Sequence, residues 1–188
     1  MKKTFCSLLM MGLLVAFTSC EKEEIENTAT VQAAGEWYVD IDAVDENGEP
    51  IPGGEHYFGY GEERVHILTY NTASNSTTQM WIDDMGWFDL GVYYDEPAYP
   101  NYSFKCLVDL DLNNLTFSSD EAENLSGDYG ITIEGGKILK GAGRQKNGSP
   151  ADSIVFYVKY EGDPWYPDDG YEMYKISGIR YSGLVDND

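Results

Sequence analysis

Residues 152–160 read Asp-Ser-Ile-Val-Phe-Tyr-Val-Lys-Tyr, and this stretch decides the fold. Ile154, Phe156 and Val158 are apolar at every second position, which is the period of a β-strand with a buried face. The intervening positions hold Val and Tyr, so the strand carries apolar residues on both faces. This property favours a strand in a small closed barrel.

Similar runs recur through the rest of the chain. The first begins at Gly35, and the others occupy residues 65–73, 78–84, 101–112, 115–118, 129–133, 137–140, 152–161 and 171–181. Asn113-Asn114 and Gly135-Gly136 stand between consecutive runs, where hairpin turns are expected. No stretch of ten residues after the N-terminal segment has a helical period. The sequence therefore predicts an all-β domain, an antiparallel up-and-down β-barrel of about eight strands, with a β-sandwich as the alternative.

The N-terminus has the order of a secretory signal. Lys2 and Lys3 precede an apolar run at residues 8–17, and Thr18-Ser19-Cys20 follows. The run is too short for a transmembrane helix, which needs about 20 apolar residues. Because a cysteine follows the small residues directly, we expect residues 1–19 to be a lipoprotein signal peptide and Cys20 to be acylated. An ordinary signal with an incidental cysteine is the alternative.

The predicted domain boundaries follow from composition. Residues 20–34 are acidic and then small and polar, which predicts a flexible tether, and residues 35–188 hold the barrel domain. The net charge of −21 becomes −23 when Lys2 and Lys3 leave with the signal. Such a charge disfavours binding to nucleic acid and flat docking on an anionic bilayer. The predicted membrane partner is therefore reached through the lipidated Cys20.

Cysteine usage excludes an internal disulfide. Cys6 leaves with the signal and Cys20 is acylated, so Cys106 alone remains. Cys106 shares a strand face with Phe104 and Val108, which favours a buried structural thiol over a nucleophile.

Two residues at opposite ends of the barrel domain resemble the lipocalin pattern. Gly35-Glu36-Trp37 opens the first strand, and Arg180 lies near the end of the last. In lipocalins such a Trp packs beneath the barrel floor against an Arg of the final strand. The resemblance implies that Trp37 and Arg180 form a structural barrel floor, with the guanidinium stacked on the indole.

The domain more specifically resembles a family of Gram-negative surface lipoproteins described as lipid-binding putative hydrolases, with a lipocalin-like barrel. The segments that carry the resemblance are 34–39, 70–75, 80–84, 148–154 and 174–178. They are scaffold and turn motifs, so they indicate the fold more strongly than the activity. The resemblance also implies that the acidic residues after Cys20 direct the protein to the outer membrane and the cell surface.

Catalytic and metal motifs are absent from the sequence. There is no Gly-x-Ser-x-Gly elbow, and the only histidines are His56 and His66. Nothing in the sequence brings His66 to Asp152 and Ser153 as a triad. We therefore predict no catalytic residues, and a hydrolase ranks third among the functions.

Calcium is the only cofactor with any support. Asp109-x-Asp111-x-Asn113 resembles the start of an EF-hand loop, but strand alternation explains these residues better. The acidic cluster Asp163, Asp168, Asp169 and Glu172 is better read as a solvated loop. No metal site and no cofactor are predicted.

Two loops of similar chemistry are the candidate binding regions. Residues 93–102 and 160–171 both combine proline, aromatic rings and carboxylates. If they share one end of the barrel, Tyr94, Tyr99, Trp165 and Tyr166 would form the rim of a ligand mouth. The alternative is that these rings simply cover the open end.

The leading hypothesis is a surface-anchored lipocalin-like barrel that binds a small hydrophobic or amphipathic ligand. Its interior is expected to be lined by alternate strand residues: Val39, Ile41, Met80, Ile82, Phe104, Val108, Phe156 and Val158. The rival is a structural or glycan-binding module that contacts a surface glycan or protein through the Tyr-rich loops.

Overall fold

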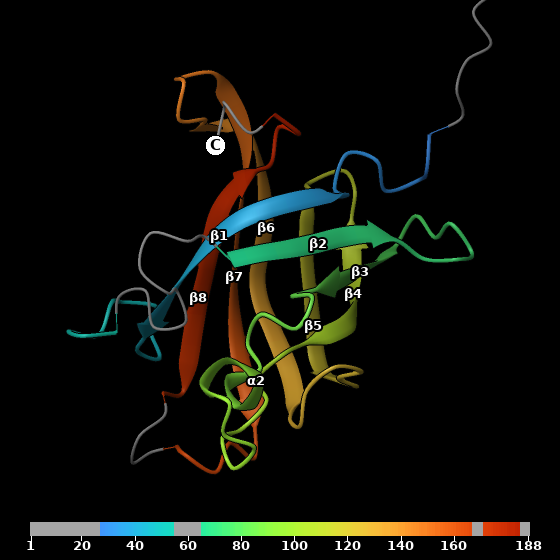
Figure 1. The fold of residues 1–188 in the computed structure, drawn as a ribbon. Coiled ribbons are helices and arrows are strands. Elements are labelled where there is room, and N and C mark those ends of the chain that lie inside the picture. The colour runs from blue at the N-terminus through green and yellow to red at the C-terminus, as the bar shows by residue number, and fades with distance from the viewer. Residues whose placement is uncertain (1–26, 55–64, 167–170, 185–188) are drawn as a thin grey trace, which may run out of the picture.

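A computed structural model describes residues 27–54, 65–166 and 171–184, and these residues form a closed barrel (Figure 1). Each strand is antiparallel to its neighbours, in the order β1 to β8. The strands are β1 (Gly35–Val44), β2 (Val65–Asn71), β3 (Gln79–Asp83), β4 (Lys105–Asp111), β5 (Thr116–Ala122), β6 (Gly130–Arg144), β7 (Pro150–Glu161) and β8 (Met173–Arg180). The predicted up-and-down barrel is confirmed, and the sandwich alternative is wrong.

Closure is seen at Trp37 in β1. This residue is paired with Ile67 of β2 on one side and with Arg180 of β8 on the other. In β1 and β7 buried and more exposed residues alternate, as the sequence period requires. One face of each strand therefore fills the barrel and the other meets solvent.

The predicted hairpin turn at Gly135-Gly136 is wrong. Both glycines lie inside β6, which is one continuous strand. They occupy a bulge, because the β6–β7 register shifts between Glu134 and Lys137. A Cβ on Gly136 would lie 2.4 Å from the carbonyl oxygen of Phe117. A glycine pair suits a bulge as well as a turn, so the two expected runs at 129–133 and 137–140 merge into one strand.

The connection from β3 to β4 contains the helix α2 (Leu90–Tyr94). The side chain of Asp89 caps its N-terminus by accepting a hydrogen bond from the amide of Val92. Asp95 ends it in the left-handed conformation, with φ of 52°. Across the described ranges, no helix has the length and apolar character needed to cross a membrane.

The two ends of the barrel differ. We call the end where β1 begins the floor and the opposite end, which carries α2, the mouth; the floor lies uppermost in Figure 1. Residues 29–33 form turns at the floor, where Thr30 and Ala33 are fully buried. Part of the segment expected to be a tether, residues 20–34, is thus packed against the barrel, because its small residues fit under the floor.

Candidate ligand-binding site

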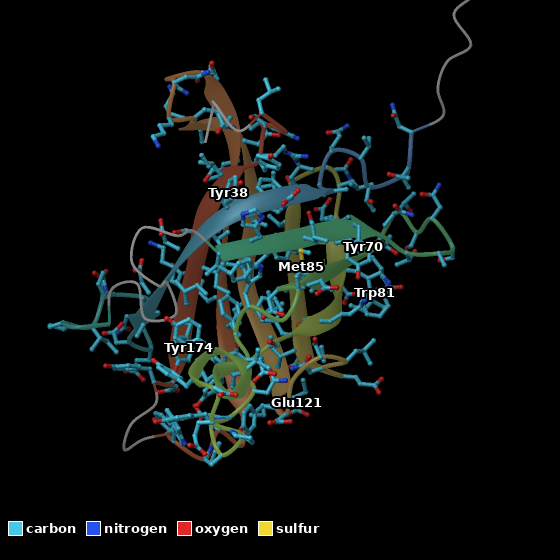
Figure 2. All side chains as sticks on the ribbon, viewed as in Figure 1. Tyr38, Tyr70, Trp81, Met85, Glu121 and Tyr174 are labelled. Atoms are coloured by element: carbon cyan, nitrogen blue, oxygen red, sulfur yellow. The ribbon has the colours of Figure 1, made fainter. Side chains whose placement is uncertain are left out.

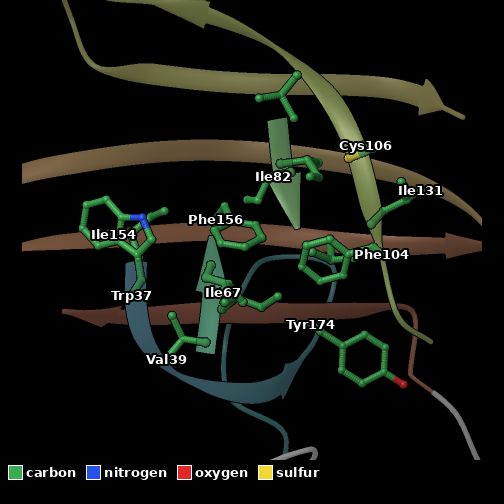
Figure 3. Packing of buried hydrophobic residues seen from close by; sticks show 14 of the residues in the cluster. Trp37, Val39, Ile67, Ile82, Phe104, Cys106, Ile131, Ile154, Phe156 and Tyr174 are labelled. Carbon is green, nitrogen blue, oxygen red and sulfur yellow. The ribbon is translucent and has the colours of Figure 1, made fainter. Parts of the chain in front are cut away.

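The middle of the barrel is apolar and closely packed (Figure 3). The eight residues expected to line the interior are between 0 and 1 % exposed: Val39, Ile41, Met80, Ile82, Phe104, Val108, Phe156 and Val158. A side chain that borders an internal hollow keeps surface that water can touch. These eight residues therefore leave no water-sized space beside them, and their own side chains fill the interior.

Buried polar groups of the described residues lie toward the ends of the barrel. Thr69 lies at the floor, where its hydroxyl accepts a hydrogen bond from the Trp37 indole at 2.9 Å. Asp84 and Ser103 lie at the mouth and are 0 and 1 % exposed. The interior between these levels offers a ligand only dispersion and hydrophobic contacts.

The β3–β4 connection closes the mouth with an aromatic ring. Phe88 is fully buried and stacks on Phe104 of the interior, with ring centroids 5.7 Å apart. The amide of Tyr102 donates to the carbonyl of Phe88 at 3.0 Å. Phe88 therefore lies between the barrel interior and the outer loops.

A buried carboxylate holds this connection in place. Asp84 Oδ1 accepts hydrogen bonds from the amides of Gly86 at 3.1 Å and Phe104 at 3.0 Å, and Oδ2 accepts from Phe88 at 3.0 Å. Burial raises the pKa of Asp84 to about 6, although these amides act in the opposite direction. The closed mouth thus contains an acid that titrates close to neutral pH.

Tyrosines form a second layer at the mouth. The Tyr102 hydroxyl donates to Asp163 Oδ1 at 2.7 Å, and its ring contacts that of Tyr160, with centroids 5.1 Å apart. Burial raises the pKa of both phenols, so they stay neutral. Asp163 Oδ2 is buried without a hydrogen-bond partner among the described residues.

The structure brings the two predicted aromatic loops together. Tyr94 contacts Tyr99 with ring centroids 5.1 Å apart, and Tyr99 contacts Trp165 at 5.4 Å. Tyr94 and Tyr166 are about half exposed, whereas Trp165 packs partly against the core. We call Tyr93, Tyr94, Tyr99, Trp165 and Tyr166 the aromatic crown.

The floor has the geometry that the lipocalin resemblance implies. The Arg180 guanidinium carbon lies 4.4 Å from the centroid of the Trp37 ring. Arg180 donates to the backbone carbonyls of Gln32 and Ala34 and pairs with Asp152 at 3.3 Å. A Cβ on Gly35 would lie 2.7 Å from the guanidinium, which explains the glycine at this position.

The residues considered for catalysis have other partners. Ser153 donates to the carbonyl of Gly178 at 2.7 Å, and Asp152 pairs with Lys140 at 2.9 Å. His66 Nδ1 lies 2.7 Å from Glu36. The three do not form a triad, and His56 lies outside the described residues. Burial raises the pKa of Cys106 to about 12, as for a structural thiol.

The described residues of the acidic segments considered for calcium show no converging ligands. Asp111 accepts hydrogen bonds from the amides of Asn113 and Asn114, which closes the β4–β5 turn. In the parts of the chain that the structure describes, no three potential ligands gather around one point. Asp168 and Asp169 lie outside those parts.

The sequence does not reveal the residues that close the mouth. Asp84 ends the strand expected at residues 78–84, and Phe88 follows it in a segment without strand or helix period, so nothing in the local pattern predicts that these two side chains are buried. The available signal was Asp84-Met85-Gly86, because an Asp two residues before a Gly is common where a side chain bonds its own turn.

The chain matches a known protein family over residues 22–185, and the family is described as "lipid-binding putative hydrolase". No curated protein matches it significantly. The match covers nearly the whole sequence, including every strand and both ends of the barrel. The chain therefore belongs to this lipid-binding family.

Proposed function

We propose that this protein is a lipoprotein, anchored through Cys20, whose barrel takes up a small single-chain amphiphile through its mouth. The family supports a lipid-like ligand. The observation that carries the proposal is the apolar interior closed at the mouth by Phe88. An acyl chain that replaces this ring would meet only apolar side chains below it.

A filled interior makes opening of the mouth a necessary step. An eight-stranded barrel is just wide enough to be filled by side chains or to hold one ligand. The acyl chain must therefore displace Phe88, and the β3–β4 connection carries that ring outward as it moves. Three rings of the aromatic crown belong to this connection, and the crown offers amphipathic Tyr and Trp rings to the polar end of the ligand.

Titration with a fluorescent fatty acid tests this proposal. We expect saturable binding at one site, with competition by an unlabelled single-chain lipid. Phe88→Ala removes the ring that blocks access, so binding should be faster and tighter. Val92→Ala is the matched control, because Val92 belongs to the same connection but is 77 % exposed and lies outside the aromatic crown. If neither the natural protein nor Phe88→Ala shows saturable binding, the interior is not a lipid site.

The second candidate function is recognition of a surface glycan or protein by the aromatic crown. A surface hollow of about 500 Å³ borders Tyr99, and its walls include the carboxylates of Asp89, Asp95 and Asp128. Ring faces beside hydrogen-bond acceptors suit a neutral sugar. If the crown binds a glycan, Tyr94→Ala with Tyr166→Ala should abolish retention on a glycan array. Loss of uptake alone would favour the lipid function.

The anchor and its location belong to the same proposal. Acylation of Cys20 places the protein on the outer membrane, and Glu21, Glu23 and Glu24 direct it to the cell surface. Incorporation of a radioactive fatty acid should disappear in Cys20→Ala. Protease accessibility on intact cells tests surface exposure, with a periplasmic protein as the control. Incorporation that persists in Cys20→Ala would contradict acylation at this residue.

A further inference from the structure

The β6–β7 hairpin has the opposite charge to the rest of the protein. Residues 137–150 contain Lys137, Lys140, Arg144 and Lys146 but no Asp or Glu. They hold four of the twelve Lys and Arg residues of a chain whose net charge is −21. We call residues 137–150 the basic hairpin.

The basic hairpin projects from the floor end of the barrel (Figure 1). Side-chain nitrogens gather on it in the stick view (Figure 2). Lys137, Lys140, Arg144 and Lys146 are all exposed, and the apolar side chain of Leu139 is 36 % exposed beside them. The hairpin therefore offers cations and one apolar side chain to a partner at the floor.

Most of this positive charge is not neutralised within the protein. Lys140 shares Asp152 with Arg180, at 2.9 and 3.3 Å. Arg144 donates only to the carbonyls of Gly141 and Gly143. Within the described residues, neither Lys137 nor Lys146 pairs with a carboxylate. Among the described residues, Asp152 is thus the one carboxylate that forms an ion pair with a cation of the hairpin.

The hairpin is also tied to the segment that leads toward Cys20. Lys140 Nζ donates to the carbonyl of Gln32 at 2.7 Å. Only residues 21–26 separate Cys20 from Asn27, the first described residue. Seven steps of extended chain span at most about 24 Å. A membrane that holds acylated Cys20 therefore lies within reach of the floor end.

We propose that the basic hairpin binds the phosphate-bearing headgroups of anionic lipids in the membrane that holds Cys20. This proposal rests on the proposed anchor. The Debye length is about 8 Å at physiological ionic strength, so the acidic mouth at the other end of the barrel is largely screened from the hairpin. Local charge then decides the contact, and lysines and arginines near an anionic surface are attracted to it. The mouth is consequently turned away from the membrane.

The test uses the processed lipoprotein reconstituted in nanodiscs of phosphatidylcholine with or without phosphatidylglycerol. We expect hydrogen exchange of the backbone amides in the basic hairpin to slow several-fold when phosphatidylglycerol is present. High salt should remove this protection. Arg144→Glu with Lys146→Glu should remove it too, whereas Lys159→Glu with Lys175→Glu, which changes the net charge equally, should retain it.

The outcomes separate the hairpin from the anchor. If the acylated protein co-elutes with both kinds of disc but the hairpin exchanges equally in them, the hairpin proposal is overturned and the anchor stands. If mass spectrometry shows an unacylated Cys20, the anchor fails. The same protein is then floated with vesicles, where the hairpin proposal expects flotation with phosphatidylglycerol only, and its absence overturns the proposal.

Discussion

The floor and the mouth of this barrel are closed by different means. At the floor, Arg180 stacks on Trp37 and bonds backbone carbonyls, and the Trp37 indole bonds Thr69. At the mouth, Phe88 is held by Asp84, a buried carboxylate without a cation among the described residues that contact it. The buried charge at the floor is paired, because Arg180 lies beside Asp152, whereas burial at the mouth disfavours the ionised form of Asp84. We therefore expect the mouth, rather than the floor, to open.

The largest expected effect is at the floor. Trp37→Ala removes a fully buried indole and the surface on which Arg180 rests. The free energy of unfolding should fall by about 3–5 kcal/mol, measured by urea denaturation. The matched control is Trp87→Ala, because Trp87 is 43 % exposed and its loss should cost much less. Equal losses in the two variants would mean that the floor is no more tightly built than the loops.

The next effect is the pH dependence of mouth closure. The pKa of Asp84 is about 6 when buried, against 3.8 for an ordinary Asp. Closure therefore favours the protonated acid, so the closed mouth is most stable below pH 3.8 and loses stability as pH rises through 6. Full ionisation costs about 3 kcal/mol. Uptake of a neutral fluorescent probe with one acyl chain should accelerate across this range.

Asp84→Asn provides the control for this pH dependence. Asparagine does not titrate, so the acceleration between pH 4 and pH 7 should vanish in the variant. An unchanged pH profile in Asp84→Asn would assign the effect to another group.

A smaller effect is expected in the tyrosine layer of the mouth. Tyr102→Phe removes the hydroxyl that donates to Asp163 and leaves that carboxylate, among the described residues, with the amide of Trp165 as its donor. Stability should fall by about 1.5–3 kcal/mol, the range for hydrogen bonds to charged groups. Tyr94→Phe changes an exposed ring, so it should leave the stability of the protein nearly unchanged. Thermal unfolding of both variants checks the difference. An unchanged stability of Tyr102→Phe would contradict the expected role of this hydrogen bond.

The smallest expected effect is on the stability of two variants, in which one glycine at each end of the barrel is replaced by alanine. Gly35→Ala places a methyl group 2.7 Å from Arg180 Nη1 and should destabilise the floor by about 1 kcal/mol. Gly91→Ala lies in α2 at the mouth, where the gain in helix propensity is offset by a close contact of the new Cβ with Asp89 Oδ1 and the Tyr99 carbonyl oxygen, each at 3.3 Å. Its stability should therefore change little. Chemical denaturation should show a loss of stability for Gly35→Ala but not for Gly91→Ala, and an equal loss in both would argue against the contrast.

The barrel could be predicted from the sequence because alternation is local. Residues 152–160 carry their burial pattern in the order of their side chains, and the structure buries Ile154, Phe156 and Val158 as expected. The Gly135-Gly136 bulge could not be distinguished from a turn, since glycine permits both. Only the pairing of β6 with β5 and β7 decides between them.

The mouth could be predicted only in part. The aromatic loops are evident from composition, and the structure brings Tyr99 and Trp165 together. Phe88 and Asp84 become buried through contacts with residues about 16 to 20 positions away, which no local period records. The basic hairpin was visible in the sequence, but a net charge summed over the chain conceals a local reversal of sign.

The pairing of β1 with β8 has a consequence for crowding. An open sheet ends in a strand whose amides and carbonyls can pair with another molecule, and such edges start aggregation. Here the first strand, β1, pairs with the last strand, β8, from Trp37–Arg180 to Val44–Met173. If the proposed anchor holds copies on a membrane surface, they meet often and at high local concentration. Ring closure lets this protein accumulate densely without edge-to-edge association between neighbours.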